Sequence, residues 1–320
     1  MGKYVARRLL LFVPTLLGVI LVIFTLMRVV PGDPALLILA GSEGDAGTVD
    51  KKALEALRQK LGLDKPIPVQ LVEYYADVFR FDFGKSLYSN QPVLQTIIKR
   101  FPLDLEIAIL AVGLTALIGI PAGVISARFQ DRWPDYVLRL ISITGLATPS
   151  FWIAILIIMA LVAFLRWTPT IQYYQLWQDP GLNLQQLFLP AIVTGLRQTA
   201  VVIRMARATT LEVIREDYIR TARAKGLGER VVLFRHALKN AMLPVVTILG
   251  LEFGIAFGSL VVTETVFNLP GIGLLLVQSI GRRDYPTIQA VVLFITTGIL
   301  VVNLLVDLTY GWLDPRIRYA

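Results

Sequence analysis

The sequence contains no cysteine and only one histidine among its 320 residues. The absence of cysteine excludes disulfide bonds, thiolate metal sites and cysteine nucleophiles. His236 alone cannot form a zinc site, and neither an HExxH pattern nor a GxSxG nucleophile elbow occurs. The sequence therefore predicts no metal site and no catalytic residue.

Charge is also scarce, because 17% of the residues are charged while 55% are hydrophobic, and the mean hydropathy is +0.66. These values indicate a membrane protein. A helix needs about 20 apolar residues to cross a ~30 Å hydrocarbon core, and the apolar runs lack the alternation of a lipid-facing strand. The sequence predicts an all-α integral membrane protein with six transmembrane helices: Leu9–Val30, Leu103–Ala127, Tyr136–Leu165, Leu187–Ala208, Leu243–Thr265 and Ile288–Trp312.

The first run follows Lys3, Arg7 and Arg8, so a cleaved signal peptide is the alternative interpretation. The run is longer than the apolar part of a typical signal peptide, and no small-x-small cleavage site follows it. We therefore interpret it as the first span.

Lysine and arginine are distributed unevenly beside the spans. Seventeen lie at the two termini, between spans two and three, and from Arg204 to Lys239, whereas the short loops on the other side carry three. By the positive-inside rule, both termini and the loop between spans four and five are cytoplasmic. Topology thus explains the basic excess, and we expect no nucleic acid partner.

Residues 31–101 form a long loop, which we interpret as an extracytoplasmic domain. The stretches "DKKALEALRQKLGL" and "VQLVEYYADVFRF" are typical of amphipathic helices, and "DFGKSLYSNQPV" is typical of a turn. Its "GKS" is not a phosphate-binding loop, because Phe79 stands where that motif requires its first glycine. No nucleotide-binding loop occurs elsewhere, so a pump would need another subunit to supply energy.

The stretch "DYIRTARAKGLGERVVLFRHALKNAMLP", residues 217–244, is basic and lies between two spans. Glu212–Lys225 has high helix propensity, and Gly226 is suited to end a helix. A second helical pattern begins after Gly228 and merges into span five. One interpretation is an interfacial helix attracted to anionic membrane lipid.

This stretch resembles the cytoplasmic EAA loop of bacterial ATP-binding-cassette (ABC) importer permeases, in the form found in B-type subunits of the dipeptide and oligopeptide branch. Other blocks are similar to the same family and occur in the same order: "RRLLLFVPTLLGV" and "RVVPGDPA", "LGLDKPIPVQ", "TETVFNLPGIGLLLVQSIGRRDYPTIQ" and "VNLLVDLTYGWLDPRIRY". The resemblance covers essentially the whole chain and implies the type I importer permease fold. The expected parts are residues 1–30 with the first span, the domain 31–101, and a permease core 102–320 containing the EAA loop 209–244.

In this family the EAA loop forms a coupling helix that docks on an ATPase subunit. Arg220 and Thr221 depart from the general pattern, and the closing Leu243-Pro244 comes late, as is typical of the peptide branch. The implied partners are a homologous second permease, two ATPase subunits and an extracytoplasmic substrate-binding protein. ATP and Mg²⁺ would bind to the ATPase subunits, and this chain would bind no cofactor. The coupling residues implied by the resemblance are Asp217, Tyr218, Ala222, Arg223, Ala224 and Gly226.

Two ionisable residues fall near the middle of predicted spans. Arg197 and Glu252 reach comparable depths near the midplane, at ~1.5 Å of rise per residue. Such residues usually face a partner or water, so we expect them to pair directly or to line the translocation pathway. Asp104, Glu106 and Glu264 lie near the outer span ends, where they can meet solvent, so we assign them no role.

Small residues form stripes at four-residue spacing, a pattern that lets helices approach closely. Gly250, Gly254 and Gly258 form one stripe, and Gly119 and Gly123 repeat the pattern. They predict packing either within this chain or against the second permease. The "VFNLPGIGLLL" segment predicts a structured turn with a short helix at the outer mouth.

The expected function is that of a non-catalytic, multi-pass permease subunit in a bacterial inner membrane, importing dipeptides or oligopeptides. Alternatives of the same class are importers of nickel chelates, glutathione or oligosaccharides. A stand-alone channel or a secondary transporter is an alternative of another class, although no internal repeat is evident. A membrane-anchored scaffold without transport is a further alternative.

Overall fold

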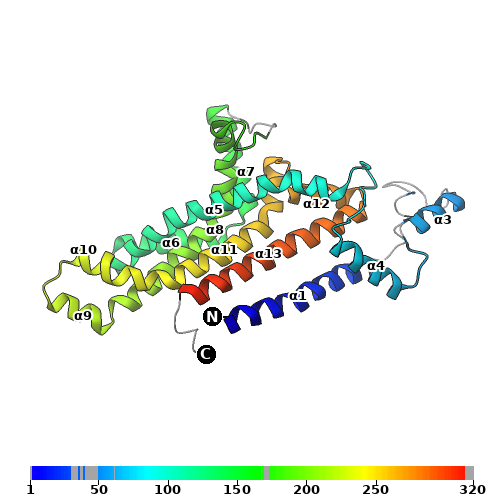
Figure 1. Ribbon diagram of the computed structural model, residues 1–320. Coiled ribbons are helices and arrows are strands. Elements are labelled where there is room, and N and C mark those ends of the chain that lie inside the picture. The colour runs from blue at the N-terminus through cyan, green and yellow to red at the C-terminus, as the bar shows by residue number, and fades with distance from the viewer. Residues whose placement is uncertain are drawn as a thin grey trace.

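The computed structural model describes residues 2–29, 35–36, 39, 50–60, 62–166, 168 and 173–313. Across these residues the secondary structure is helical, apart from an isolated antiparallel bridge between Lys85 and Pro92. The long helices run side by side along one axis (Figure 1). The predicted all-α membrane fold is confirmed. The C-terminal Arg316 and Arg318 lie outside the described residues.

Five long apolar helices correspond to the predicted spans one, two, four, five and six. Their ends extend beyond the apolar runs because polar turns continue several of the helices past the hydrocarbon thickness. Helix α13, the last of the five in the chain, packs against both α1 and α11. The bounds are α1 Gly2–Val29, α5 Val93–Arg128, α8 Pro180–Ile214, α11 Leu238–Phe267 and α13 Tyr285–Leu313.

The predicted third span is not one helix, which corrects the interpretation of Tyr136–Leu165 as a single run. It consists of α6 (Trp133–Ala147) and α7 (Ser150–Leu165), which meet at a bend of 102°. Pro149 causes the break, because its ring disfavours helical geometry in the preceding residue and it has no N–H for the helix ladder. Thr148 is accordingly extended, with φ −94° and ψ 127°.

The short helices lie at opposite ends of the bundle (Figure 1). Helices α9 (Asp217–Ala224) and α10 (Glu229–Val231) lie at the end where α1 begins and α13 ends. Helices α3 (Lys51–Lys60), α4 (Ile67–Phe79) and α12 (Ile272–Gly281) lie at the other end. The positive-inside rule assigns the basic α9 end to the cytoplasm, and we call the two ends the cytoplasmic end and the outer end.

The bundle is held by close packing, because lipid tails are as apolar as leucine and give helices little hydrophobic drive to associate. Glycines on α5 and α8 allow this approach. A Cβ added at Gly195 would lie 2.8 Å from the Ala111 carbonyl oxygen, and one added at Gly123 would lie 2.6 Å from the Ile203 carbonyl oxygen. A cluster of buried side chains joins α5, α7, α8 and α11 nearer the outer end: Leu103, Ile107, Ala154, Leu187, Val193, Leu260, Phe267 and Leu269.

The described part of residues 31–101 is anchored on α1 and α13. The Tyr75 hydroxyl donates to the Leu17 carbonyl oxygen over 2.7 Å. Ile20 and Leu293 pack beneath Tyr74 and neighbouring apolar side chains of α4. Predicted helices in this region are present as α3 and α4, and the predicted turn is a hairpin over residues 82–92, closed by the bridge between Lys85 and Pro92.

Candidate functional site

The segment between α8 and α11 folds as two short helices joined by a tight turn. Helix α8 ends at Ile214, α9 follows after two residues, and the turn contains Gly226 with φ +78°. A side chain rarely adopts this left-handed backbone, which glycine adopts freely. The Gly226 N–H donates to the Arg223 carbonyl oxygen over 2.9 Å, as expected of a glycine that ends a helix. Beyond the turn, α10 and a π-helix, η2 (Val232–Ala237), lead into α11.

The inner face of α9 packs against its own chain. Ile219 is fully buried and Ala222 is 7% exposed. Both contact a cluster formed by Val124 of α5 with Val232 and Leu233 of η2. The small Ala222 side chain therefore lets α9 lie close to the bundle. Sequence reasoning missed Ile219, although an isoleucine in a basic, polar helix marks the buried face.

The outer face of α9 points to solvent. The Asp217 and Arg220 side chains are 92% and 79% exposed and lie 3.4 Å apart. Such a pair contributes little to stability. The Tyr218 hydroxyl accepts a hydrogen bond from Asn240 Nδ2 over 2.8 Å, and Arg223 Nε donates to Glu229 Oε1 over 2.7 Å. Ala224 of α9 is exposed, and so are three apolar side chains of the turn and helices that follow it: Leu227, Val231 and Phe234.

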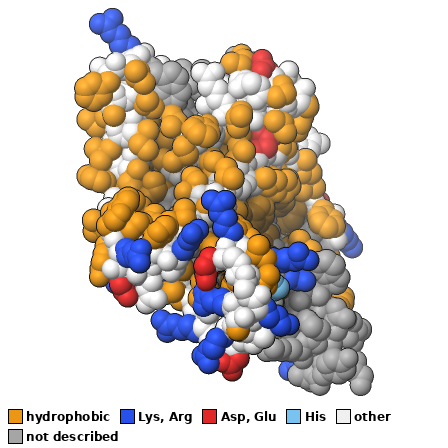
Figure 2. Space-filling view, turned by 90° about the vertical axis from the view of Figure 1, so that its left-hand side faces the viewer, with side chains coloured by type: hydrophobic (Ala, Val, Ile, Leu, Met, Phe, Trp, Pro, Cys, Tyr) orange, Lys and Arg blue, Asp and Glu red, His pale blue; other side chains and the backbone are white. Residues whose placement is uncertain are grey.

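Figure 2 shows this end of the molecule, with lysine and arginine side chains gathered around a mixed apolar and polar surface. Acidic side chains are fewer: Glu212, Glu216, Asp217 and Glu229 are the exposed ones in this stretch. The surface can therefore attract an acidic partner while offering apolar contacts. The exposed basic residues of the stretch are Arg215, Arg220, Arg223, Lys225, Arg230, Arg235 and Lys239.

A buried ion pair lies at the cytoplasmic end of the bundle. Asp135 of α6 is fully buried and accepts two hydrogen bonds from Arg207 of α8, over 2.7 Å and 2.8 Å. Ser126 Oγ of α5 donates to the same carboxylate over 2.5 Å. The pair therefore ties three helices together at the cytoplasmic end. It was missed from the sequence because Asp135 and Arg207 are far apart in the chain.

Arg197 and Glu252 do not form an ion pair with each other in the described part of the chain. Glu252 is 7% exposed, and its backbone carbonyl accepts a hydrogen bond from Gln198 Nε2 over 3.0 Å. Arg197 instead lies on the exposed side of α8. The two side chains thus make no salt bridge, although their charges are close enough to interact.

Next to Arg197, an apolar groove runs between α5, α6 and α8 and the start of α7. Its volume is about 480 Å³, which is within the range of ~300–1,000 Å³ typical of small-molecule sites. It carries no charged side chain among its lining residues. These are Leu114, Ile118, Leu140, Ile141, Thr144, Gly145, Thr148, Ile153, Ile192, Gly195, Leu196, Thr199, Ala200 and Ile203.

Both glycine stripes pack within the chain. A Cβ added at Gly250 would lie 2.5 Å from Val306, and one added at Gly258 would lie 3.0 Å from Ile299, so the α11 stripe faces α13. Gly254 lies between them and also faces α13, through Val302 and Asn303. The α5 stripe of Gly119 and Gly123 faces Val202 and Ala206 of α8.

Two of the acidic residues near the outer span ends are buried rather than in solvent, which corrects that interpretation. Asp104 is 2% exposed and Glu264 is fully buried. Backbone N–H groups at the start of α12 satisfy them in part, a contact that hydropathy does not reveal. Glu106 is half-buried and accepts hydrogen bonds from Tyr173 and Asn183, over 2.8 Å and 2.7 Å. Burial and the hydrogen bond to Glu106 raise the pKa of the Tyr173 phenol.

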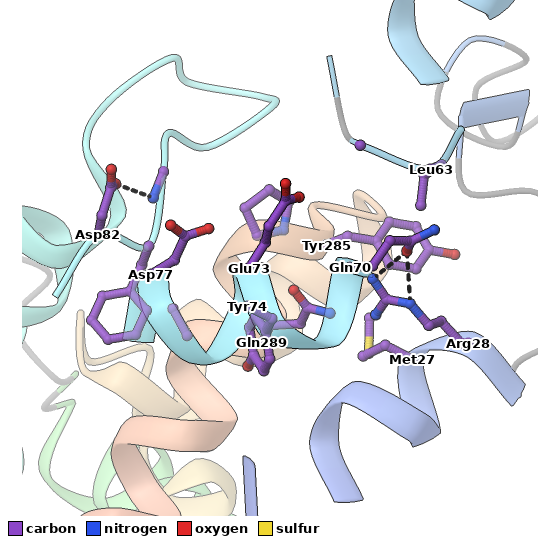
Figure 3. Close-up of a pocket in the computed structure, with 15 residues that line it drawn as sticks. Met27, Arg28, Leu63, Gln70, Glu73, Tyr74, Asp77, Asp82, Tyr285 and Gln289 are labelled. Carbon is purple, nitrogen blue, oxygen red and sulfur yellow. Dashed lines mark hydrogen bonds between the residues drawn. The ribbon is translucent and has the colours of Figure 1, made fainter. Parts of the chain in front are cut away.

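A cavity of about 330 Å³ opens at the outer end, between α1, α4, the hairpin and α13. Figure 3 shows Glu73, Asp77 and Asp82 along one side, with Arg28 and Gln70 on the other. Two nitrogens of Arg28 donate to Gln70 Oε1, over 3.0 Å and 2.7 Å. Burial, with a smaller effect of the Asp82 carboxylate, raises the pKa of Asp77. Because carboxylates outnumber the guanidinium, the cavity favours cationic groups over anionic ones.

Comparison with known proteins gives consistent matches along the chain. Residues 119–319 match the family described as "binding-protein-dependent transport system inner membrane component", and residues 1–108 match the N-terminal family of the same membrane components. The chain is similar to the glutathione transport system permease protein GsiC of Escherichia coli (strain K12), at 41% identity over 319 residues and 100% of both chains. It is similarly related to the proteins of the same name from Salmonella typhi, at 41% identity, and Shigella flexneri serotype 5b, at 40% identity, again over 100% of both chains.

Proposed function

Because this chain belongs to the family of inner membrane components of binding-protein-dependent transport systems, and so is a permease subunit of a bacterial ABC importer, we propose that it forms part of a pathway for short peptides, including glutathione. ATP hydrolysis in such importers takes place in separate subunits, and the chain itself is not an enzyme. The observation that carries the substrate proposal is an exposed arginine beside an uncharged groove within the membrane-spanning bundle.

The groove between α5, α6 and α8 is this chain's side of the pathway in our proposal, and a homologous second permease closes it. Its lining is apolar apart from threonine hydroxyls and backbone. Such a surface places few demands on the side chains of a substrate, as transport of varied peptides requires. Specificity would then rest mainly on the backbone and terminal groups of the peptide and on the substrate-binding protein.

Arg197 recognises the carboxylate of the substrate in this proposal. It follows Leu196 and precedes Thr199 on α8, and both of these residues line the groove. Its guanidinium forms no salt bridge among the described residues, and Glu252 is the carboxyl group with which it interacts electrostatically. An arginine at the membrane midplane usually marks a substrate path, and a guanidinium binds a carboxylate through two parallel hydrogen bonds. Dipeptides, oligopeptides and glutathione all carry a carboxylate, whereas neutral oligosaccharides do not.

The exposed face of α9 is the ATPase dock in this proposal. Asp217, Tyr218 and Arg223 contact the ATPase subunit, Ala224 adds apolar contact, and Gly226 sets the turn that presents the helix. Ala222 contributes by seating α9 on α5 and η2, since it lies on the inner face. Movement of the ATPase subunits would then be transmitted to α5, α6 and α8 through the packing of α9 on α5 and η2 and through the ion pair between Asp135 and Arg207.

Uptake by the reconstituted complex tests the substrate proposal. The permease, its second permease, both ATPase subunits and the substrate-binding protein are placed in proteoliposomes with labelled glutathione, a dipeptide or the same dipeptide amidated at its C-terminus. We expect Arg197→Gln to raise the KM for the free dipeptide by about tenfold or more, the loss expected for a hydrogen bond to a charged group. Transport of the amide should change little.

Arg204→Gln is the matched control, because Arg204 lies two turns further along α8 and is also exposed. Equal effects of the two substitutions, or equal loss for dipeptide and amide, would contradict carboxylate recognition by Arg197. Transport of a nickel chelate or an oligosaccharide, without transport of peptides, would replace the peptide proposal with the corresponding alternative. Uptake in the absence of ATPase subunits would indicate a channel or a secondary transporter.

A further inference from the structure

The start of α12 is fastened to two transmembrane helices through its backbone. The Ile272 N–H donates to Asp104 Oδ1 of α5 over 3.1 Å, and the Leu274 N–H donates to Glu264 Oε2 of α11 over 2.8 Å. Arg100 of α5 donates to the Gly271 carbonyl oxygen over 3.1 Å. A carboxylate near a helix N-terminus satisfies N–H groups that have no partner within the helix.

Glycines let this attachment form. A Cβ at Gly271 would overlap the Glu264 carboxyl group, and one at Gly273 would lie 2.5 Å from Val261 Cα of α11. The "LPGIG" turn therefore places its backbone directly on α11. The short apolar helix that follows has exposed side chains at Val277 and Ile280, 41% and 57% respectively.

The other end of α12 is fastened to the hairpin over residues 82–92. Asp284 is 4% exposed and accepts hydrogen bonds from Ser86 Oγ over 2.5 Å and from the Leu87 N–H over 3.0 Å. The Arg282 guanidinium lies 3.9 Å from the centre of the Tyr88 ring. Helix α12, a short apolar helix of 10 residues, thus bridges the membrane bundle and the outer hairpin.

The attachment at the start of α12 is incomplete. Glu264 Oε1 is buried and accepts no hydrogen bond from a nitrogen or hydroxyl donor of the described residues, and the neighbouring Asp104 carboxyl can donate to Glu264 only when it is protonated. Asp104 and Glu264 bring two carboxyl groups close to the single guanidinium of Arg100. When both carboxyl groups are ionised, Glu264 Oε1 is left unsatisfied, which costs free energy. The position of α12 is then stabilised less than a fully bonded one, and the free energy needed to leave it is smaller.

We propose that Asp104, Glu264 and Arg100 are positioning residues for the outer mouth, which hold α12 in place at rest and release it during the transport cycle. The inference rests on the proposed importer function and deepens it. The hairpin attached through Asp284 moves with α12, so a protein that docks on the hairpin can favour the released position. The groups that decide the equilibrium are the backbone N–H groups of Ile272 and Leu274 and their two carboxylate acceptors.

Cysteine labelling tests this proposal, because the chain contains no cysteine of its own. Ser279→Cys places a nearly isosteric thiol on α12 at a site that is 4% exposed. The full complex in lipid nanodiscs is treated with a membrane-impermeant maleimide, at rest and with ATP, substrate-binding protein and peptide. We expect slow labelling at rest and labelling about tenfold faster during turnover, whereas a helix that only supports the fold would show no change.

Variants of the attachment then identify its residues. Glu264→Ala removes the acceptor for Leu274 and should raise resting labelling by about tenfold or more, the loss of a hydrogen bond to a charged group. Glu264→Gln retains an acceptor oxygen and should label close to the wild-type rate. Glu106→Ala is the matched control, because Glu106 lies on α5, two residues after Asp104, but accepts hydrogen bonds from Tyr173 and Asn183 instead of from α12.

Several results would overturn the proposal. Labelling that is unchanged by turnover would show that α12 does not move, and equal rates for Glu264→Ala and Glu106→Ala would show that the carboxylate does not hold it. If Glu264→Ala does not assemble, Arg100→Gln removes both the bond to Gly271 and the positive charge beside the two carboxyl groups, and should raise resting labelling in the same direction. Co-purified ATPase subunits with peptide-stimulated hydrolysis, measured on the same samples, separate a failure of this inference from a failure of the importer proposal.

Discussion

Substitution of Gly226 isolates the backbone geometry of the proposed coupling turn. Its φ is +78° and a Cβ added there meets no atom within 4 Å, so a side chain would strain the backbone without a clash. A left-handed conformation costs an L-residue roughly 1–2 kcal/mol. Gly226→Ala should therefore reduce the fraction of molecules with the native turn by about fivefold to thirtyfold relative to other turn conformations. Asn adopts this region more readily than Ala, and Val less readily.

The assay is capture of the ATPase subunits by the purified permease pair in nanodiscs, followed by peptide-stimulated ATP hydrolysis. Apparent affinity falls by the fraction of molecules that are competent to bind, so affinity should decrease in the order Gly, Asn, Ala, Val at position 226. Gly228→Ala is the matched control in the same loop. Its φ is −64° and a Cβ there also meets no atom within 4 Å, so we expect wild-type capture.

Equal loss in Gly226→Ala and Gly228→Ala would refute the reasoning, because the two positions differ in φ and not in crowding. Full capture of the ATPase subunits by Gly226→Val would also refute the reasoning, because that result would show that the left-handed turn is not required for docking. In that case the basic segment would be better explained as a helix that binds anionic lipid. A loss of stimulated hydrolysis with normal capture would place the effect of the turn after docking.

Two further predictions concern stability within the bundle. Asp135→Ala leaves the Arg207 guanidinium, which is 22% exposed, without its buried partner. It should lower the free energy of unfolding by about 3 kcal/mol, towards the lower end for broken buried pairs. A shift in the thermal unfolding midpoint of the purified protein measures this loss, and an unchanged midpoint would contradict it. Gly250→Ala forces a methyl group to within 2.5 Å of Val306 and should destabilise the packing of α11 on α13 by about 1–3 kcal/mol, whereas Gly113→Ala, which meets no atom within 4 Å, should be neutral in the same measurement.

Hydropathy predicted much of the fold because a span must satisfy all its backbone groups internally, which leaves a long apolar helix as the available solution. The same reasoning could not place the bend between α6 and α7, since Tyr136–Leu165 is predominantly apolar and long enough for one span. The local signal was Pro149, which restricts Thr148 to an extended backbone. A proline is compatible with a kinked helix or with a break, and the packing of α7 against α8 and α11 accompanies a break here.

Side-chain partners were harder to predict than helices. Arg197 and Glu252 lie at similar depths, but depth leaves the rotation of each helix undetermined, and rotation decides whether two side chains meet. In the structure Glu252 is buried and Arg197 is exposed, and their charges interact without forming a salt bridge. Charge alone therefore identified the right helices without identifying the contact.

Asp104 and Glu264 show a different limit. From sequence alone, a carboxylate near the end of an apolar run is interpreted as a group that reaches water, because contact with water is the arrangement with the lowest free-energy cost in that position. In the structure their partners are the N–H groups at the start of α12, which lies 168 residues after Asp104 in the chain. Every helix start exposes such N–H groups whatever its sequence, so no residue type marks them as partners. The "LPGIG" turn was the available clue, since its glycines permit an approach to α11 that any side chain would block. Glycines that flank a short apolar helix therefore point to a buried backbone contact, and an otherwise unexplained carboxylate nearby is the natural candidate to make it.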